Sequence, residues 1–293
     1  MNAIQTEGLT KFYGSSRGIL DLDLTVQEGE FYGFIGPNGA GKSTTIRTLL
    51  GLIRKTRGSA RVLGKDIAKE KEQILAETGY LPSEAVFYPD MRGRDLIRLS
   101  ADLHRKDCKK TSEELCERLQ LDPSRRIGEL SFGNRKKLAV VCALQHNPRL
   151  CILDEPTGGL DPLMQREFFE ILKERNRQGM TVFLSSHILS EIQRFCSRAA
   201  IIREGRIIAS GSVEELARTN AKRISIRGSF DPSGLPDVRD LQRSDDTVSF
   251  LYGGDINLLL ARLGKDPILD LTISEPDLEE IFLHYYTKGE EQP

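Results

Sequence analysis

The stretch "FYGFIGPNGAGKSTTIRTLL", residues 31–50, decides the fold. It opens with a short apolar run typical of a buried strand, and a helical pattern follows at about 42–53. Between them, "GPNGAGKST" fits the phosphate-binding pattern G-x-x-x-x-G-K-[ST] in the strand–loop–helix context that this pattern requires. We therefore predict an α/β domain with a nucleotide site, whose loop comprises Gly36, Pro37, Asn38, Gly39, Ala40, Gly41, Lys42, Ser43 and Thr44.

The residue types of this loop suit phosphate chemistry. Backbone N–H groups must approach phosphate oxygens closely, and the three glycines leave room for that approach. Lys42 offers a positive charge to the β- and γ-phosphates, and the Ser43 hydroxyl can bind Mg²⁺. The predicted ligand is a nucleotide with its magnesium ion.

Two further motifs belong to strand ends. "LCILDEP", residues 150–156, is an apolar run that ends in two carboxylates, and ligands of open α/β sheets bind at that edge. We expect Asp154 to hold Mg²⁺ through water and Glu155 to polarise or deprotonate an attacking water. In "SSH", His187 follows the predicted strand 181–185 on the same edge, so we predict that it joins the site.

Short apolar runs alternate with helical patterns along the first two thirds of the chain. This alternation predicts an α/β domain with a largely parallel sheet. The runs 2–8 and 19–27 have no helix between them and predict an antiparallel flank, and residues 94–121 read as helical with one charged turn. The predicted strands are 31–35, 150–154, 181–185 and 199–203, and the predicted helices are 42–53, 131–146, 164–178 and 188–197.

The pattern of predicted strands and helices changes near residue 212. We place a nucleotide-binding domain at 1–218, with a helical insertion at about 85–129, and a small α/β accessory domain at 219–293. The accessory domain is of roughly the smallest size that folds alone. Its predicted strands are 222–227, 247–252 and 267–273, and its predicted helices are 255–263 and 276–286.

Composition excludes several classes of protein. The 293 residues carry a net charge of −1, so broad electrostatic binding to nucleic acid is not expected. The N-terminal residues lack the basic-then-apolar pattern of a secretory signal, and no apolar run reaches the ~18 residues of a membrane span. The five cysteines form no C-x-x-C pair and suit reduced thiols in a cytoplasm. If the protein acts at a membrane, we expect another chain to cross it.

The stretch "LSFGNRKKLAVVCAL", residues 130–144, begins a helix in an unusual way. Ser131 is a good N-cap, but the first turn has basic residues where acidic ones would stabilise the partial positive charge of the helix end. Such a turn is either a poorly tuned helix end or a binding site for an anion.

The order of these motifs resembles that of the nucleotide-binding subunits of ABC transporters. The phosphate loop, the helical insertion, "LSFGN", "ILDEP", "GGLDP" and "SSH" follow one another within residues 2–215. The resemblance implies a P-loop NTPase of the ABC-ATPase type. Such a protein has a RecA-like core, an antiparallel β flank and a helical insertion, here followed by the small C-terminal α/β appendage.

The resemblance also implies a role for the helix that begins at Ser131. In that family two subunits dimerise head to tail around ATP, and "LSFGN" matches the signature that closes over the ATP of the partner. Ser131 and the Gly133 backbone would then contact the γ-phosphate, which supplies the missing anion. Tyr13 matches the aromatic residue that stacks on adenine, and Asp161 in "GGLD" matches the loop that links the two sites.

The sequence departs from the family pattern in a few positions. Phe132 and Asn134 replace a glycine and a glutamine of the signature, and Gly158 replaces a hydroxyl. Ser83 stands where a glutamine usually touches Mg²⁺, and serine is too short to do so without a bridging water. Since Lys42, Asp154, Glu155 and His187 are all present, we predict an active ATPase.

The function that the resemblance implies is ATP hydrolysis that powers a separate polytopic membrane permease. The C-terminal segment resembles extensions of drug, lipid and antibiotic exporters, so export is favoured. The subunit would form a homodimer and sit on the cytoplasmic face of the membrane. We expect the permease to dock at Ser83–Arg94, where four apolar residues occupy a loop: Val86, Phe87, Tyr88 and Met91.

Two alternatives remain. One is a soluble ABC ATPase that acts on a cytosolic macromolecule such as a ribosome. The other is a regulatory module that does not hydrolyse ATP, and Glu155 disfavours it.

Overall fold

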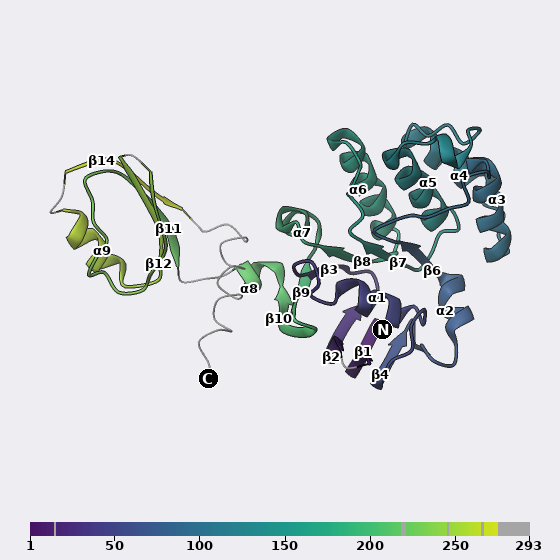
Figure 1. Cartoon of the computed structure of the whole chain (residues 1–293), viewed down its shortest axis with the longest axis horizontal. Coiled ribbons are helices and arrows are strands. Elements are labelled where there is room, and N and C mark those ends of the chain that lie inside the picture. Colours follow the sequence, from purple (N-terminus) through teal and green to yellow (C-terminus); the bar gives the residue numbers. More distant parts are fainter. Residues whose placement is uncertain (15, 218–220, 245, 265–266, 275–293) are drawn as a thin grey trace. The chain divides into compact units, whose positions relative to one another are not determined.

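The structure is a computed structural model that describes the chain except residues 15, 218–220, 245, 265–266 and 275–293. It divides into two units, Met1–Val213 and the part from Glu214 onward. Each unit has its own sheets and helices (Figure 1). The helix predicted at 276–286 lies outside the described residues.

A six-stranded sheet forms the centre of the first unit, in the order β10-β9-β3-β8-β7-β6. Its inner strands pair in parallel, and β10 is an antiparallel edge strand. All four predicted strands are confirmed; β6 and β10 were not predicted. The strands are β3 (Phe31–Ile35), β6 (Thr78–Leu81), β7 (Leu150–Asp154), β8 (Thr181–Ser186), β9 (Arg198–Arg203) and β10 (Arg206–Ser212).

The predicted antiparallel flank is a second sheet in the order β2-β1-β4-β5. Its first two strands are longer than predicted because their pairing extends to Tyr13 and Ser16. The sheet consists of β1 (Asn2–Tyr13), β2 (Ser16–Gln27), β4 (Arg57–Val62) and β5 (Lys65–Asp66).

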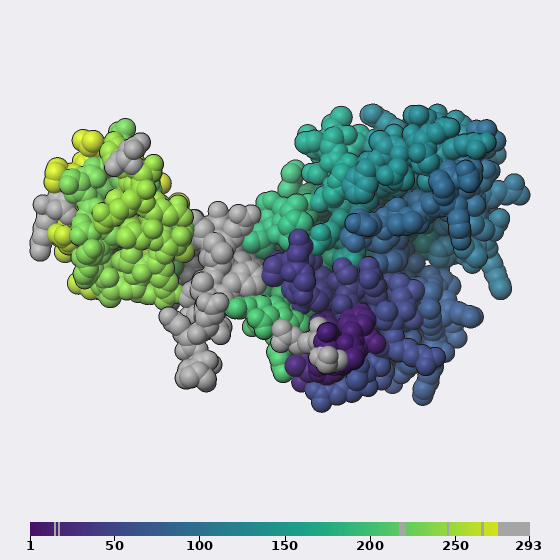
Figure 2. Space-filling model, in the orientation of Figure 1, coloured from purple at the N-terminus to yellow at the C-terminus, as the bar shows by residue number. Residues whose placement is uncertain are grey.

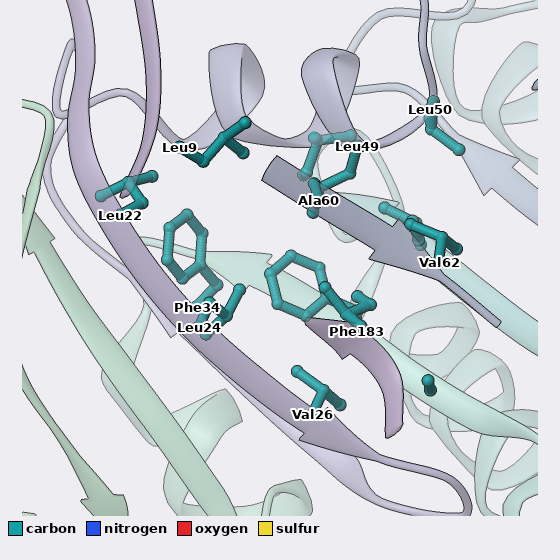
Figure 3. Packing of buried hydrophobic residues seen from close by; sticks show 14 of the residues in the cluster. Leu9, Leu22, Leu24, Val26, Phe34, Leu49, Leu50, Ala60, Val62 and Phe183 are labelled. Carbon is teal, nitrogen blue, oxygen red and sulfur yellow. The ribbon is translucent and has the colours of Figure 1, made fainter. Parts of the chain in front are cut away.

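The main core lies between the two sheets and includes helix α1 (Lys42–Leu49). Leu22 and Leu24 of β2, Leu49 of α1 and Phe34 and Phe183 of the central sheet converge there (Figure 3). The rings of Phe34 and Phe183 have centroids 5.3 Å apart. This packing holds α1 against the sheet, so the loop before α1 has a fixed position.

The remaining helices of this unit lie on the other side of the central sheet, except α2 (Figure 1). The predicted helical insertion is present as α3 and α4, which form part of the outer surface of this unit (blue to teal in Figure 2). Arg118 of α4 ties the insertion to α6 through an ion pair of 2.7 Å with Glu167. The helices are α2 (Lys71–Glu77), α3 (Gly93–His104), α4 (Lys109–Arg118), η1 (Ile127–Glu129), α5 (Phe132–Leu144), α6 (Pro162–Arg177) and α7 (Leu189–Phe195).

The second unit contains an antiparallel sheet in the order β12-β13-β11-β14. Leu259 and Leu263 of α9 pack on one face of the sheet. Strand β12 was not predicted. Nearly all of its side chains are exposed, so its sequence lacks the apolar alternation of a half-buried strand, and its backbone pairing with β13 defines it. The elements are α8 (Val213–Ala217), β11 (Lys222–Gly228), β12 (Val238–Ser244), β13 (Thr247–Tyr252), α9 (Ile256–Leu263) and β14 (Ile268–Ser274).

A pair of stacked histidines lies beside the C-terminal end of α5. His146 is only 1% exposed, and its ring centroid lies 3.6 Å from that of His104. Burial lowers the pKa of His146 to about 3, and the charges of His104 and Lys106 add to this effect. His146 is therefore neutral in the folded protein at neutral pH.

We expect this histidine to make the first unit sensitive to acid. Below the ordinary histidine pKa of about 6.5, the unfolded chain binds a proton that folded His146 does not, so the free energy of unfolding falls as pH falls from there toward 3. His146→Phe keeps a flat aromatic ring but cannot bind a proton. Its free energy of unfolding should therefore fall less between pH 7 and pH 5. Urea unfolding followed by circular dichroism at both pH values measures this. An equal loss in both proteins would contradict it.

Candidate functional site

The predicted phosphate loop joins β3 to α1 and is shaped by its glycines. A Cβ atom on Gly36 would lie 2.4 Å from the carbonyl oxygen of Ile202, so no side chain fits there. Gly41 precedes α1 with φ +109°, a conformation that other residues rarely adopt. The first turn of α1 has no acidic residue, and no side chain among the described residues caps it. Its N-terminus is therefore open to an anion.

Lys42 is buried, and its ammonium group contacts both the loop and Glu155. Its Nζ donates hydrogen bonds to the carbonyl oxygens of Gly36 at 2.7 Å and Pro37 at 3.1 Å. The same atom forms an ion pair of 3.0 Å with Oε1 of Glu155. An ammonium has three hydrogens, so an arriving phosphate must compete with the Glu155 carboxylate for this cation.

Glu155 stands just beyond the end of β7 in a strained conformation. Its φ is +47°, which is unusual for a residue other than glycine, and its N–H donates to the carbonyl oxygen of Ser185 at 3.1 Å. Oε2 lies 3.4 Å from Nδ1 of His187. Burial raises the pKa of Glu155, but the hydrogen bond and charge of Lys42, with His187, outweigh burial and lower it overall. The side chain is thus a carboxylate at neutral pH.

Asp154, at the end of β7, is fully buried, and one of its two carboxylate oxygens accepts a hydrogen bond. The Ser185 hydroxyl donates to its Oδ1 at 2.8 Å. Its Oδ2 has no hydrogen-bond partner among the described residues. A buried carboxylate oxygen without a partner is costly, and oxygen atoms of this kind are the ligands that Mg²⁺ prefers. The donor set of Asp154 and the Ser43 hydroxyl therefore fits Mg²⁺ with a nucleotide.

Two cavities meet at Glu155. One of about 220 Å³ is lined by the half-exposed Tyr13, the phosphate loop and Glu155, and its wall includes Ser43. The other, of about 500 Å³, is lined by Ser83, Phe132, Glu155 and His187. The structure thus gathers the predicted residues of four motifs around one carboxylate.

The predicted ATP-binding residues other than Tyr13 and the phosphate loop line neither cavity. Ser131 caps α5 by accepting a hydrogen bond of 3.2 Å from the N–H of Asn134, and Asp161 caps α6 in the same way. A Cβ atom on Gly133 would lie 2.7 Å from the carbonyl oxygen of Gly159, so the signature packs closely on the "GGLD" loop. Contacts of Ser131, Gly133 and Asp161 with ATP remain predictions that require a second subunit.

Sequence reasoning missed two residues of this site. One is Ser185, which binds both Asp154 and Glu155. The other is Lys136, which lies in the basic turn of α5 but points inward and is 2% exposed. Burial lowers its pKa to about 8, and the charges of Asp154 and Glu155 oppose that shift. The available signal was helical spacing, since Lys136 precedes the buried Val140 by four residues.

Comparisons with known proteins agree with these features. A family model described as ABC transporter matches residues 19–158. The bacitracin transport ATP-binding protein BcrA of Bacillus licheniformis is 35% identical over 297 residues, which cover 96% of each chain. The linearmycin resistance ATP-binding protein LnrL of Bacillus subtilis is 30% identical over 96% of this chain and 97% of its own.

The fold has counterparts among solved structures. One, described as the structure of the ATP binding subunit of an ABC transporter, is 31% identical and covers 74% of this chain and 92% of its own, with a TM-score of 0.69. The chain spans nearly the whole length of the curated relatives above. It therefore belongs to the ABC transporter family, as one of the ATP-binding, ATP-hydrolysing subunits.

Proposed function

We propose that this subunit hydrolyses ATP with Glu155 as the general base, works as a head-to-tail homodimer, and powers a separate membrane permease. One observation carries the catalytic part of the proposal. Lys42, Glu155 and His187 form a continuous chain of contacts at the edge of the parallel sheet, with separations of 3.0 Å and 3.4 Å. A phosphate-binding cation, a carboxylate and an imidazole thus meet where the two cavities join.

The Lys42–Glu155 ion pair suggests how nucleotide binding prepares the base. A γ-phosphate at the open end of α1 attracts the Lys42 ammonium more strongly than a single carboxylate does, because it carries more negative charge. Glu155 then loses its cation and remains beside His187. Its carboxylate, directed at an attacking water, can accept the proton that the water loses. His187 orients the carboxylate during this step.

The chain offers a magnesium site next to the base. Ser43 would bind Mg²⁺ directly and Asp154 through water, while Ser83 would reach it only through a bridging water. When bound with ATP, Mg²⁺ neutralises charge on the phosphates. The chain's own contribution is to hold Asp154 in place through the hydroxyl of Ser185.

The remaining ATP contacts are assigned to Tyr13 and to a second copy of the subunit. The half-exposed Tyr13 ring lies on the wall of the phosphate-loop cavity, where a purine can stack on it. In the dimer, Ser131 and Gly133 of the second copy contact the γ-phosphate, and Asp161 links the two sites.

The docking surface for the permease lies in the loop between β6 and α3. Val86 and Tyr88 are 86% and 74% exposed, whereas Phe87 and Met91 are partly buried. Large exposed apolar side chains in one loop favour a protein partner. No helix within the described residues is long and apolar enough to span a bilayer. On this proposal the subunit is peripheral, on the cytoplasmic face of the membrane, and the permease crosses it.

The direction and class of transport are proposed from the relatives. One is named for bacitracin transport and the other for linearmycin resistance, and each match covers nearly all of both chains. We infer export of an antibiotic-like compound. Co-purification of a polytopic membrane protein with the subunit tests this against action on a cytosolic macromolecule.

Glu155→Gln tests the catalytic proposal. The amide keeps the shape of the side chain but cannot accept the proton of water, so ATP turnover should fall by roughly 10²–10⁴-fold while ATP still binds. Trapped ATP should also stabilise the dimer, which size-exclusion chromatography with ATP detects. Retention of most hydrolysis would assign the base to another residue.

Lys42→Ala should act on binding instead. It removes the cation of the phosphate loop and with it charge-assisted hydrogen bonds worth about 1.5–3 kcal/mol each, so ATP affinity should fall at least about 10-fold. Titration calorimetry with ATP measures this, with Glu155→Gln as the control that keeps affinity. Unchanged affinity would refute the assignment of the phosphate loop.

Tyr88→Asp tests the docking surface. An exposed aspartate in this loop disfavours burial against the permease, so the complex should be lost while the ATPase activity of the isolated subunit is kept. Leu241→Asp, at an exposed leucine of β12 in the second unit, is the matched control. Pull-down of the permease with tagged subunit is the measurement. Normal assembly of the Tyr88 variant would place the docking surface elsewhere.

A further inference from the structure

Lys136 is a buried lysine that forms no salt bridge within the described residues and is held by backbone carbonyl groups. Its Nζ donates to the carbonyl oxygens of Pro82 at 3.0 Å, Ser83 at 2.9 Å and Glu155 at 3.3 Å. All three ammonium hydrogens thus have acceptors. Such an arrangement offsets the cost of burying a charge, and the nearby carboxylates of Asp154 and Glu155 also favour the charged form.

The backbone carbonyl group that Lys136 binds in Glu155 belongs to a residue in a strained conformation. Glu155 has φ +47°, and residues in such strained conformations keep them only when the surrounding structure holds them on several sides. The N–H of Glu155 is held by both the carbonyl oxygen and the hydroxyl of Ser185, at 3.1 Å and 3.3 Å. Lys136 holds the opposite end of the residue, its carbonyl oxygen. The direction of the Glu155 carboxylate depends on both attachments.

The other two acceptors belong to a different segment. Pro82 and Ser83 follow β6 and begin the loop that leads through Val86 and Tyr88 to the helical insertion. Among the described contacts, no hydrogen bond joins the Ser83 side chain to Glu155, although both line one cavity. The Lys136 ammonium supplies the link instead, through the main chain of Ser83.

We propose that Lys136 is a positioning residue that ties the loop after β6 to Glu155 and fixes the direction of the catalytic carboxylate. The inference rests on the proposed role of Glu155 as the base. A movement of the loop is transmitted through one ammonium to the backbone of the base. Lys136 touches neither nucleotide nor water in this role, so it acts on the rate of hydrolysis and not on the binding of ATP.

Lys136→Met tests this role, because it keeps the length of the side chain and removes the three donors. A base displaced by about 1 Å loses up to roughly 100-fold in rate, so we expect kcat to fall roughly 10- to 100-fold. The Kd for ATP should change less than about threefold. Lys136→Arg, which keeps charge and donors, should recover most of the rate.

The control is Lys106→Met, which removes a single hydrogen bond of 2.8 Å from an exposed lysine to the carbonyl oxygen of His146, at the other end of α5. It should leave kcat within about twofold. Thermal unfolding of both variants separates a loss of stability from a loss of rate. If Lys136→Met does not fold, Lys136→Gln is measured in its place, with kcat expressed per ATP-binding site.

A double-mutant cycle with Glu155→Gln tests whether Lys136 acts through the base. Lys136→Met should not lower the residual rate of Glu155→Gln further, because the base is already lost. A full additional loss in that background would overturn the proposal, as would an unchanged kcat of Lys136→Met in the wild-type background or a failure of Lys136→Arg to recover the rate. If Glu155→Gln itself retains activity, the proposed function fails instead, so the two failures are distinguishable.

Discussion

The parallel pairing of β3, β8 and β7 is the constraint on which the site depends. Parallel strands end at the same edge of a sheet, and the register places Ile35 beside Ser186 and Asp154 beside Ser185. The phosphate loop, the carboxylates of β7 and His187 therefore leave the sheet as neighbours, although they are far apart in sequence. An antiparallel β7 would carry Asp154 and Glu155 to the opposite edge.

The two buried lysines of the site have different kinds of hydrogen-bond acceptors. Lys42 shares its hydrogens between two carbonyl oxygens and the Glu155 carboxylate, so one of its partners can be exchanged for a phosphate. Among the residues that the structure describes, Lys136 donates only to backbone carbonyl oxygens, which cannot leave without moving the chain. Two buried ammonium groups flank one glutamate; in our proposal the first responds to nucleotide and the second keeps the backbone in place.

The same glutamate has a strained backbone conformation. A left-handed conformation at Glu155 costs on the order of 1–3 kcal/mol, which the rest of the protein must offset. Ser185 and Lys136 hold the two ends of this residue, from β8 and α5 respectively. The carboxylate of this residue contacts Lys42 and His187.

The sequence by itself determined the motifs and most of the first unit. Apolar runs predicted the four inner strands, and the spacing of glycines, Lys42 and Ser43 predicted the phosphate site, because these signals are local and need no knowledge of distant residues. It did not reveal β12, since an exposed edge strand is defined by its partner's backbone.

Only the tertiary structure decided how the charged groups are paired. The basic turn of α5 looks the same in sequence whether its lysines face solvent, an anion or the interior. Packing of α5 against the sheet turned Lys136 toward three carbonyl oxygens from two distant segments. The Lys42–Glu155 ion pair likewise depends on the order of the strands. So does the Asp154 oxygen that has no hydrogen-bond partner in the part of the chain that the structure describes. Hydrogen bonds between remote segments depend on distances that exist only after the chain has folded.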